Sequence, residues 1–149
     1  MTELVITDAR SLDAGPVGHI LSVSNESMPW LPRVHSAAEE IKYAGDMIDA
    51  GWVRVAKFDH RVIGFIARHD EEVYALYVLP EAQDKGVGTA LLDDAKARCD
   101  RLALWSYEAN GMAAHFYGLR GFVEVARTDG SGNEARLPDI RMEWQKGSG

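Results

Sequence analysis

The segment that most constrains the fold of this chain is residues 76–92, where a hydrophobic strand leads into a glycine-containing turn that opens a helix. Gly86 and Gly88 allow the backbone to approach a ligand closely. The first amides of the following helix point outward at the positive end of its dipole, which favours an anion. A pyrophosphate is the expected ligand, although an isolated Gly-x-Gly can equally be an ordinary tight turn.

Two common nucleotide-binding motifs are excluded in this segment. A P-loop needs Gly-Lys-Ser or Gly-Lys-Thr, and neither triplet occurs in the chain. Leu91 stands where the dinucleotide-binding fingerprint requires its third glycine. The absence of both motifs narrows the range of ligands that the turn can bind.

Hydrophobic periodicity indicates one α+β domain over residues 1–149. Strands are expected at residues 4–9, 52–58, 61–67, 73–79, 102–107, 122–126 and 140–144, and helices from Ser11 or Asp13 to about Asn25, from Ser36 to Gly51, from Val87 to about Cys99 and from Ala113 to about Leu119. Hairpins join the early strands, whereas helices separate the later ones. The fold should therefore contain a mixed, mostly antiparallel sheet of about seven strands flanked by about four helices.

Local signals mark several boundaries of these elements. Ser36 and Glu39 form a capping box at the start of the second helix. The stretch 128–133, which is rich in Gly, Ser and Asn, predicts a flexible turn between strands. The last strand, 140–144, is expected at an exposed edge of the sheet, where it could pair with a second copy to give a homodimer or could simply be solvated.

The composition excludes several classes of partner. The formal net charge of −7 argues against a surface that binds nucleic acid or anionic lipid. No apolar run approaches the ~20 residues needed to cross a bilayer, and the chain begins with an acid where a signal peptide carries a base. The single cysteine cannot form an internal disulfide, and the five histidines lack metal-ligand spacing. We therefore expect a cytoplasmic protein with no nucleic-acid, membrane or metal partner.

Two motifs in the second half of the chain carry a family resemblance. Gln83, Gly86 and Gly88 match the pattern Gln/Arg-x-x-Gly-x-Gly/Ala, and residues 110–122 match Asn-x-x-Ala-x-x-Phe-Tyr-x-x-x-Gly-Phe. Together they resemble the acetyl-CoA signature of the GCN5-related N-acetyltransferase (GNAT) family. The resemblance is sharp over residues 73–122, and the order of the other elements agrees with it. It implies a GNAT-like acyl-CoA N-acyltransferase fold and an N-acetyltransferase with acetyl-CoA as cosubstrate.

The resemblance also implies which residues bind the cosubstrate. Backbone groups of Tyr77 and Val78 would hold the pantetheine arm in the manner of an added strand. Asn110 should contact the same arm, with Ala113 and Phe116 lining its groove, although plain core packing of Phe116 is an equal alternative. The pyrophosphate would be bound by amides of the turn and of the first helical residues, namely Gln83, Asp84, Lys85, Gly86, Val87, Gly88, Thr89 and Ala90.

Acetyl transfer to an amine requires proton transfers. A lysine-like amine has a pKa of about 10.4 and must lose a proton before it attacks. The resemblance places the hydroxyl of Tyr117 near the thioester sulfur as general acid, and the alternative is a tyrosine that only packs. Glu72, Glu108 and His35 are candidates for the general base, with Glu72 ranked first because it precedes the cosubstrate strand, and a chain of waters is the alternative. The amide of Val78 would polarise the thioester carbonyl.

The loop between the first two helices is expected to set acceptor specificity, because long loops beside a rigid site often do. Trp30 could wall a pocket or plug the core, and Arg33 could hold a substrate carboxylate. His35 lies in the same loop. Trp105 and Tyr107, near the end of a strand, could add to the wall.

Three functions are compatible with these residues. The first is an N-acetyltransferase that acts on an amine of a small molecule or peptide. The second is a non-catalytic acyl-CoA sensor or interaction module, which would keep the loop from Gln83 to Gly88 but could dispense with Tyr117. The third is an unrelated mononucleotide binder that is indifferent to the pantetheine arm. The presence of Tyr117 favours the enzyme.

Overall fold

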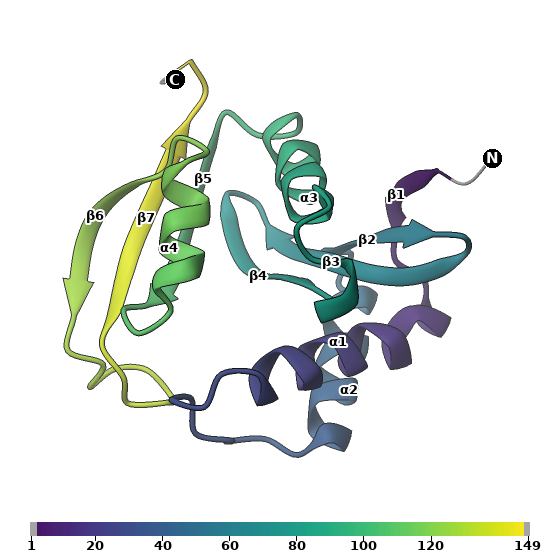
Figure 1. The fold of residues 1–149 in the computed structure, drawn as a ribbon, viewed down its shortest axis with the longest axis horizontal. Coiled ribbons are helices and arrows are strands. Elements are labelled where there is room, and N and C mark those ends of the chain that lie inside the picture. Colours follow the sequence, from purple (N-terminus) through teal and green to yellow (C-terminus); the bar gives the residue numbers. More distant parts are fainter. Residues whose placement is uncertain (1–2, 148–149) are drawn as a thin grey trace.

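A computed structural model describes residues 3–147, which form one seven-stranded sheet with helices packed on both of its faces (Figure 1). The strands are β1 (Leu4–Asp8), β2 (Val53–Phe58), β3 (Arg61–His69), β4 (Glu72–Val78), β5 (Arg101–Tyr107), β6 (Val123–Thr128) and β7 (Asp139–Gln145). The α-helices are α1 (Ala14–Glu26), α2 (Ala37–Asp49), α3 (Val87–Lys96) and α4 (Gly111–Gly118), and short 3-10 turns lie at Ser11–Asp13 and Pro80–Ala82. The mixed fold expected from the sequence is confirmed.

The strand order is β1-β2-β3-β4-β5-β7-β6. All neighbours are antiparallel except β4 and β5, which are parallel and are connected through α3. The expectation that residues 140–144 form an edge strand is wrong, because β7 lies between β5 and β6 and pairs with both. The edge strand on this side of the sheet is β6, whose residues are all exposed.

Strands β4 and β5 pair over a short length and then part. Within residues 3–147, their register consists of two residue pairs, Glu72 with Ala103 and Val73 with Leu104. Beyond Val73, the side of β4 that faces β5 has no strand beside it. A strand side without a partner presents backbone N–H and C=O groups that an extended ligand can bind. This opening in the middle of the sheet positions the site described below.

Helix starts follow local chemistry. At α2 the Ser36 hydroxyl accepts a hydrogen bond from the Glu39 amide (3.2 Å), and the Glu39 carboxylate accepts one from the Ser36 amide (3.0 Å), so the capping box is confirmed. At α1, Asp13 is the N-cap residue, as one of the two expected candidates, but its side chain does not cap this helix. The Asp13 carboxylate accepts a hydrogen bond from the Arg10 amide (2.8 Å) and thereby closes a 3-10 turn before the helix begins.

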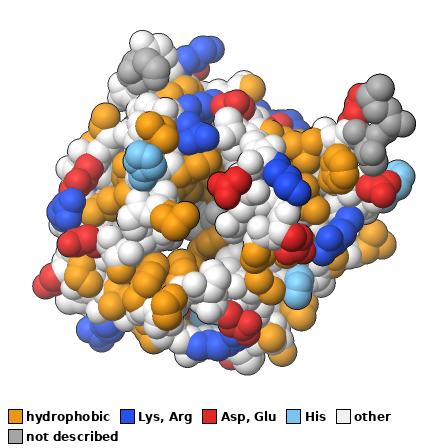
Figure 2. Space-filling view, viewed as in Figure 1, with side chains coloured by type: hydrophobic (Ala, Val, Ile, Leu, Met, Phe, Trp, Pro, Cys, Tyr) orange, Lys and Arg blue, Asp and Glu red, His pale blue; other side chains and the backbone are white. Residues whose placement is uncertain are grey.

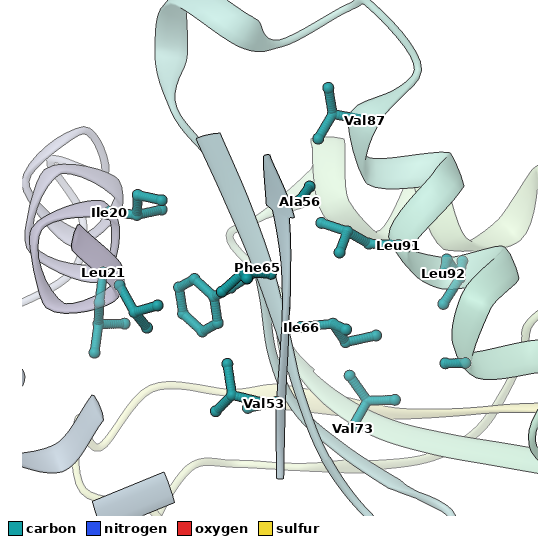
Figure 3. Packing of buried hydrophobic residues seen from close by; sticks show 14 of the residues in the cluster. Ile20, Leu21, Val53, Ala56, Phe65, Ile66, Val73, Val87, Leu91 and Leu92 are labelled. Carbon is teal, nitrogen blue, oxygen red and sulfur yellow. The ribbon is translucent and has the colours of Figure 1, made fainter. Parts of the chain in front are cut away.

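The hydrophobic core lies on both faces of the central strands (Figure 3). Successive residues of β3 point in opposite directions, so Phe65 packs toward Ile20 of α1 while Ile66 packs toward Leu91 of α3. Each of these four side chains is at most 1% exposed. Burial of a side chain of this size contributes about 1.5–3 kcal/mol, so β3 fixes both helical layers to one rigid sheet.

Candidate functional site

Two neighbouring cavities open beside the parted strands and share Met28 and Tyr77 as lining residues. The first, called here the turn cavity, has a volume of about 690 Å³ and lies among the end of β4, the turn before α3, and α4. The second, called the loop cavity, has a volume of about 800 Å³ and lies among α1, α2, the loop between them and the β6–β7 loop. Figure 2 shows the surface hollowed between α4 and the end of α1, with hydrophobic side chains around the hollow.

The turn cavity is built on the segment that the sequence singled out. Gly86 is the N-cap residue of α3 and adopts the left-handed conformation (φ 82°), which a residue with a Cβ rarely adopts. A Cβ added to Gly88 would lie 3.4 Å from the ring of Phe116, so a side chain there would narrow the space between α3 and α4. The turn is fixed to β4 by Gln83, whose Nε2 donates to the carbonyl of Val78 (3.1 Å). These contacts bring the positive end of the α3 dipole to the cavity.

Most of the residues expected to bind the cosubstrate line the turn cavity. The group comprises Tyr77, Val78, Gln83, Asp84, Gly86, Val87, Gly88, Thr89, Asn110, Ala113 and Phe116, whereas Lys85 and Ala90 are not among the lining residues. Asn110 has a structural role as well, because its side-chain oxygen accepts a hydrogen bond from the Ala113 amide (3.2 Å) and caps α4.

Tyr117 is buried on α4 and also lines the turn cavity. Its ring packs edge-on against Phe116, with ring centroids 5.2 Å apart, and at a tilt of 57° against Phe122, with centroids 5.3 Å apart. Burial raises the pKa of Tyr117 far above its usual value of 10, and the nearby Tyr77 raises it further. Burial likewise raises the pKa of Tyr77 to about 12. Both phenols therefore keep their protons at neutral pH, which suits an acid or a hydrogen-bond donor and not a base.

Arg33 ties the α1–α2 loop to both helices. Its guanidinium donates to Glu26 (2.6 Å), to Glu40 (2.9 Å) and to the Ser22 hydroxyl (3.0 Å). Glu40 is 4% exposed and also accepts hydrogen bonds from Ser22 (2.9 Å) and Asn25 (2.6 Å). Arg33 was expected to hold a substrate carboxylate. The structure instead uses its charge within the protein, where it neutralises a buried acid.

His35 joins two loops that lie far apart in the sequence. Its Nε2 is 2.5 Å from Oε1 of Glu134 in the β6–β7 loop, and its Nδ1 is 3.6 Å from Oε2 of Glu39. The hydrogen bond to Glu134 is the main reason that the pKa of His35 is raised. All three side chains line the loop cavity. Sequence reasoning missed Glu134, because nothing in a turn-forming stretch marks which acid folds toward the site.

The β6–β7 loop is fixed by its own side chains, although the sequence predicted a flexible turn. The Asn133 Nδ2 donates to the Leu137 carbonyl (2.7 Å) and to Asp139 (3.2 Å), and Thr128 donates to Asp139. Gly130 has a φ of 88°, and a Cβ there would lie 2.3 Å from the backbone of Leu137. The loop therefore presents Glu134 from a defined backbone.

The structure separates the remaining sequence candidates. Trp30 lines the turn cavity and packs edge-on against Tyr107 of the loop cavity, with centroids 5.8 Å apart. Trp105 lines neither cavity; the residue is 47% exposed, and its ring centroid lies 5.4 Å from the guanidinium of Arg141. The expected contribution of Trp105 to the acceptor wall is therefore not supported by its position.

Glu72 is also placed away from both cavities. It is the first residue of β4, about 20 Å along the strand from Val78 at the usual rise per residue. Both of its oxygens accept hydrogen bonds from Arg141 (2.7 Å each). Glu108, the other carboxylate considered as a base, pairs with Arg127 (3.3 Å) and lines neither cavity. Of the three candidate bases, His35 alone reaches a cavity wall.

Among the described residues, 3–147, there is no cluster of three or more His, Cys, Asp or Glu side chains that could hold a metal ion. None of the helices in the same range is long and apolar enough to span a bilayer.

Comparison with known proteins gives one family. Residues 49–124 match the family model described as "Acetyltransferase (GNAT) domain". Over 89 residues the chain is 33% identical to the peptidyl-lysine N-acetyltransferase YiaC of Escherichia coli (strain K12), and this match spans 58% of the chain and 58% of the relative.

Solved structures share the fold over nearly the whole chain. The apo-form of YjaB from Escherichia coli superimposes with a TM-score of 0.81 at 19% identity, covering 97% of this chain and 99% of that one. The structure of yncA from Salmonella typhimurium, solved with acetyl-CoA, gives a TM-score of 0.71 at 20% identity and covers 96% and 94% of the two chains.

Proposed function

The chain belongs to the GNAT acetyltransferase family, and on this premise we propose that it transfers the acetyl group of acetyl-CoA to an amine at the junction of the two cavities. The observation that carries the proposal is the shared wall at Tyr77 and Met28. A cosubstrate in the turn cavity and an acceptor in the loop cavity would meet there. Direct attack needs the two reacting atoms about 3–3.5 Å apart, and adjoining cavities allow that approach.

The turn cavity fits acetyl-CoA on two counts. The unpaired side of β4 near Tyr77 and Val78 offers backbone groups to the amides of a pantetheine arm. The amides that follow Gly86 offer donors to a pyrophosphate at the positive end of α3. A ligand with both features binds along one continuous groove. A mononucleotide would use the second feature alone.

Tyr117 is assigned as the general acid. The acceptor nitrogen forms a bond to the acetyl carbon while the carbon–sulfur bond breaks, and the departing sulfur takes a proton. Tyr117 lines the turn cavity and keeps its proton because burial raises its pKa. The proton lost by the acceptor nitrogen returns through solvent and restores the phenol. Positioned proton transfer of this kind contributes about 10²–10⁴-fold to the rate.

Water in the loop cavity is assigned as the proton acceptor for the attacking amine. His35 is the candidate base that reaches this cavity, but its ring nitrogens face Glu134 and Glu39. These contacts raise its pKa and so favour the charged form, which has no lone pair to offer. We assign His35 a part in shaping the loop cavity and no part in the proton transfer itself.

The acceptor is proposed to be a cationic amine, with the lysine side chain of a peptide as the first candidate. The loop cavity is lined by more carboxylates than cations: its acids are Glu26, Glu39, Glu40, Asp46 and Glu134, and its cations are Arg33 and Lys42 together with His35. An excess of negative charge attracts an ammonium group and raises its local concentration. YiaC, a relative over part of the chain, is named as a peptidyl-lysine N-acetyltransferase, which supports the same choice.

The test is release of free CoA thiol from acetyl-CoA in the presence of lysine peptides, polyamines, amino acids and aminoglycosides. Tyr117→Phe should lower kcat by about 10²-fold or more while the Kd for acetyl-CoA stays close to that of the unmodified protein. Tyr74→Phe is the matched control, because Tyr74 lies on β4 but lines neither cavity. Equal turnover by Tyr117→Phe would remove this residue from the mechanism. Acetyl-CoA binding without transfer to any amine would favour a sensor.

A further inference from the structure

Arg120 lies two residues beyond α4 and is fixed against the first turn of α3. Its Nε and Nη2 donate to the Thr89 hydroxyl (3.0 and 2.6 Å), and its Nη1 donates to the Phe116 carbonyl (3.0 Å). The guanidinium also stacks over the Phe116 ring, 3.9 Å from its centroid. Thr89, Phe116 and Arg120 all line the turn cavity. The arginine is therefore held in one place at the wall of this cavity.

The charge of Arg120 is not neutralised within the described part of the chain. Its partners are a hydroxyl and a carbonyl, and no carboxylate of residues 3–147 lies within ion-pair distance of it. Arg33, which lines the other cavity, is bound to two carboxylates. Among the described residues that line the turn cavity, Arg120 is the one cation and Asp84 the one acid. An arginine held in a groove with no carboxylate paired to it is arranged for an anion from outside the chain.

The guanidinium also has donors to spare. An arginine carries five N–H groups, and the contacts with Thr89 and Phe116 use three of them. One N–H remains on each terminal nitrogen, and two such donors form a fork that suits phosphate oxygens. Thr89 lies in the first turn of α3, and the backbone amides of this turn carry the partial positive charge of the helix N-terminus. Both features act on a negative group in the same part of the cavity.

We propose that Arg120 binds a phosphate group of acetyl-CoA, with Thr89 and the Phe116 ring as the residues that position it. The inference rests on the proposed function, because it assumes that acetyl-CoA occupies the turn cavity. The shared chemistry is a phosphate, which the cosubstrate carries both in its pyrophosphate and on its ribose. The matching family pattern leaves the residue before the final Gly-Phe open, so the motif itself gives no signal for Arg120.

The experiment compares acetyl-CoA binding by calorimetry in the unmodified protein, Arg120→Gln, Arg120→Lys and Arg98→Gln. Loss of a charge-assisted contact should raise the Kd of Arg120→Gln by about tenfold to a hundredfold. Arg120→Lys keeps the charge but loses the fork, and should fall between the two. Arg98→Gln removes the same charge beyond the opposite end of α3 and should leave the Kd unchanged. Thermal unfolding of each variant checks that the fold is retained.

Two truncated analogues of acetyl-CoA show which of its phosphate groups Arg120 binds. If Arg120 binds the ribose phosphate, Arg120→Gln and the unmodified protein should bind acetyl-dephospho-CoA equally well. If it binds the pyrophosphate, the difference should persist with that ligand. Acetyl-pantetheine has neither group, and both proteins should bind it with the same weak affinity.

Two results would overturn the inference, and they are distinguishable. An Arg120→Gln variant that binds acetyl-CoA as tightly as the unmodified protein would refute the role of Arg120 and leave the proposed function standing. An unmodified protein that does not bind acetyl-CoA at all would overturn both.

Discussion

Nε2 of His35 lies 2.5 Å from Oε1 of Glu134, although 99 positions of the chain separate the two residues. The contact joins the loop after α1 to the loop between β6 and β7 at the wall of the loop cavity, where Figure 1 shows the two loops side by side. The pairing of β4 with β5 divides the sheet into one half with β1 to β4 and another with β5, β7 and β6. The contact between His35 and Glu134 links the two halves at a second point, away from that pairing. An acceptor that binds in this cavity, as proposed above, would meet the linked loops.

This contact predicts the titration of His35. The pKa of His35 is raised above 6.5 mainly by the hydrogen bond to Glu134, so Glu134→Gln should lower it toward that value. A raised pKa means that the charged form stabilises the fold; the contribution is complete below pH 6.5 and is lost as the pH rises through the raised value. NMR titration of the imidazole measures the shift. Glu39→Gln, which removes the weaker contact, should shift it less, and an unchanged pKa in Glu134→Gln would contradict this account.

The buried tyrosines predict how the proposed activity and the stability of the protein change at alkaline pH. Because burial raises the pKa of Tyr117 far above 10, this proposed general acid should remain protonated, and kcat/KM should show no fall from its ionisation up to about pH 10. Stability should decline instead above pH 10, where tyrosines of the unfolded chain ionise and those of the folded chain do not. Parallel pH profiles of activity and circular dichroism test both points. A decline in activity near pH 8 that disappears in Tyr117→Phe would show that the pKa is not raised.

The space around Gly18 and Gly15 predicts that alanine substitutions at these two positions of α1 have different effects on stability. A Cβ at Gly18 would lie 2.6 Å from Cγ1 and 2.7 Å from Cα of Ile41, so Gly18→Ala must separate α1 from α2 and should cost about 1–3 kcal/mol of stability. Gly15 lies on the same helix with nothing within 4 Å of its added Cβ, and Gly15→Ala should be neutral or stabilising by up to about 1 kcal/mol. Urea unfolding of both variants is the measurement. Equal stabilities would mean that the two helices can separate freely.

The contacts of Glu72 predict that substituting this residue lowers stability but leaves activity unchanged. The bidentate contact with Arg141 holds β4 to β7 across β5, and both side chains are mostly buried. Glu72→Gln should therefore lower stability by about 1 kcal/mol and leave kcat unchanged, because the residue lines neither cavity. Arg141→Gln, which breaks the same contact from the other side, should behave alike. A large loss of kcat at full stability would restore Glu72 as the base.

The parts of the fold that the sequence predicted are those held by neighbours along the chain. The two residues of the capping box, Ser36 and Glu39, are three positions apart, and the left-handed turn at Gly86 depends on one residue. Both can be found from spacing and residue type alone. The same holds for the hairpin between β2 and β3, whose turn residues Asp59 and His60 both have positive φ.

The predictions that proved wrong concern features that depend on contacts between segments far apart in the sequence. A strand pattern over residues 140–144 does not state which strands flank it, so the interior place of β7 could not be found. Nor does a carboxylate indicate its partner: Glu72 was expected at the site and is bound to Arg141, whereas Glu134 was overlooked and reaches His35. Pairing over 69 and 99 positions is decided by the packed fold and leaves no local pattern.

The short pairing of β4 with β5 also determines how the molecule would respond to mechanical load. The N-terminal strand β1 belongs to one half of the sheet, and β7, near the other end of the chain, belongs to the second half (Figure 1). Tension on β1 and β7 passes through the pairing of β4 with β5, which consists of two residue pairs. The other strand pairings along the same path have five to seven residue pairs each. Side-chain contacts such as Glu72–Arg141 and His35–Glu134 also cross between the halves, but in backbone pairing the joint of β4 with β5 is the weakest link in the path of the force. Stretching would therefore pull the proposed active site open before it unravelled either half.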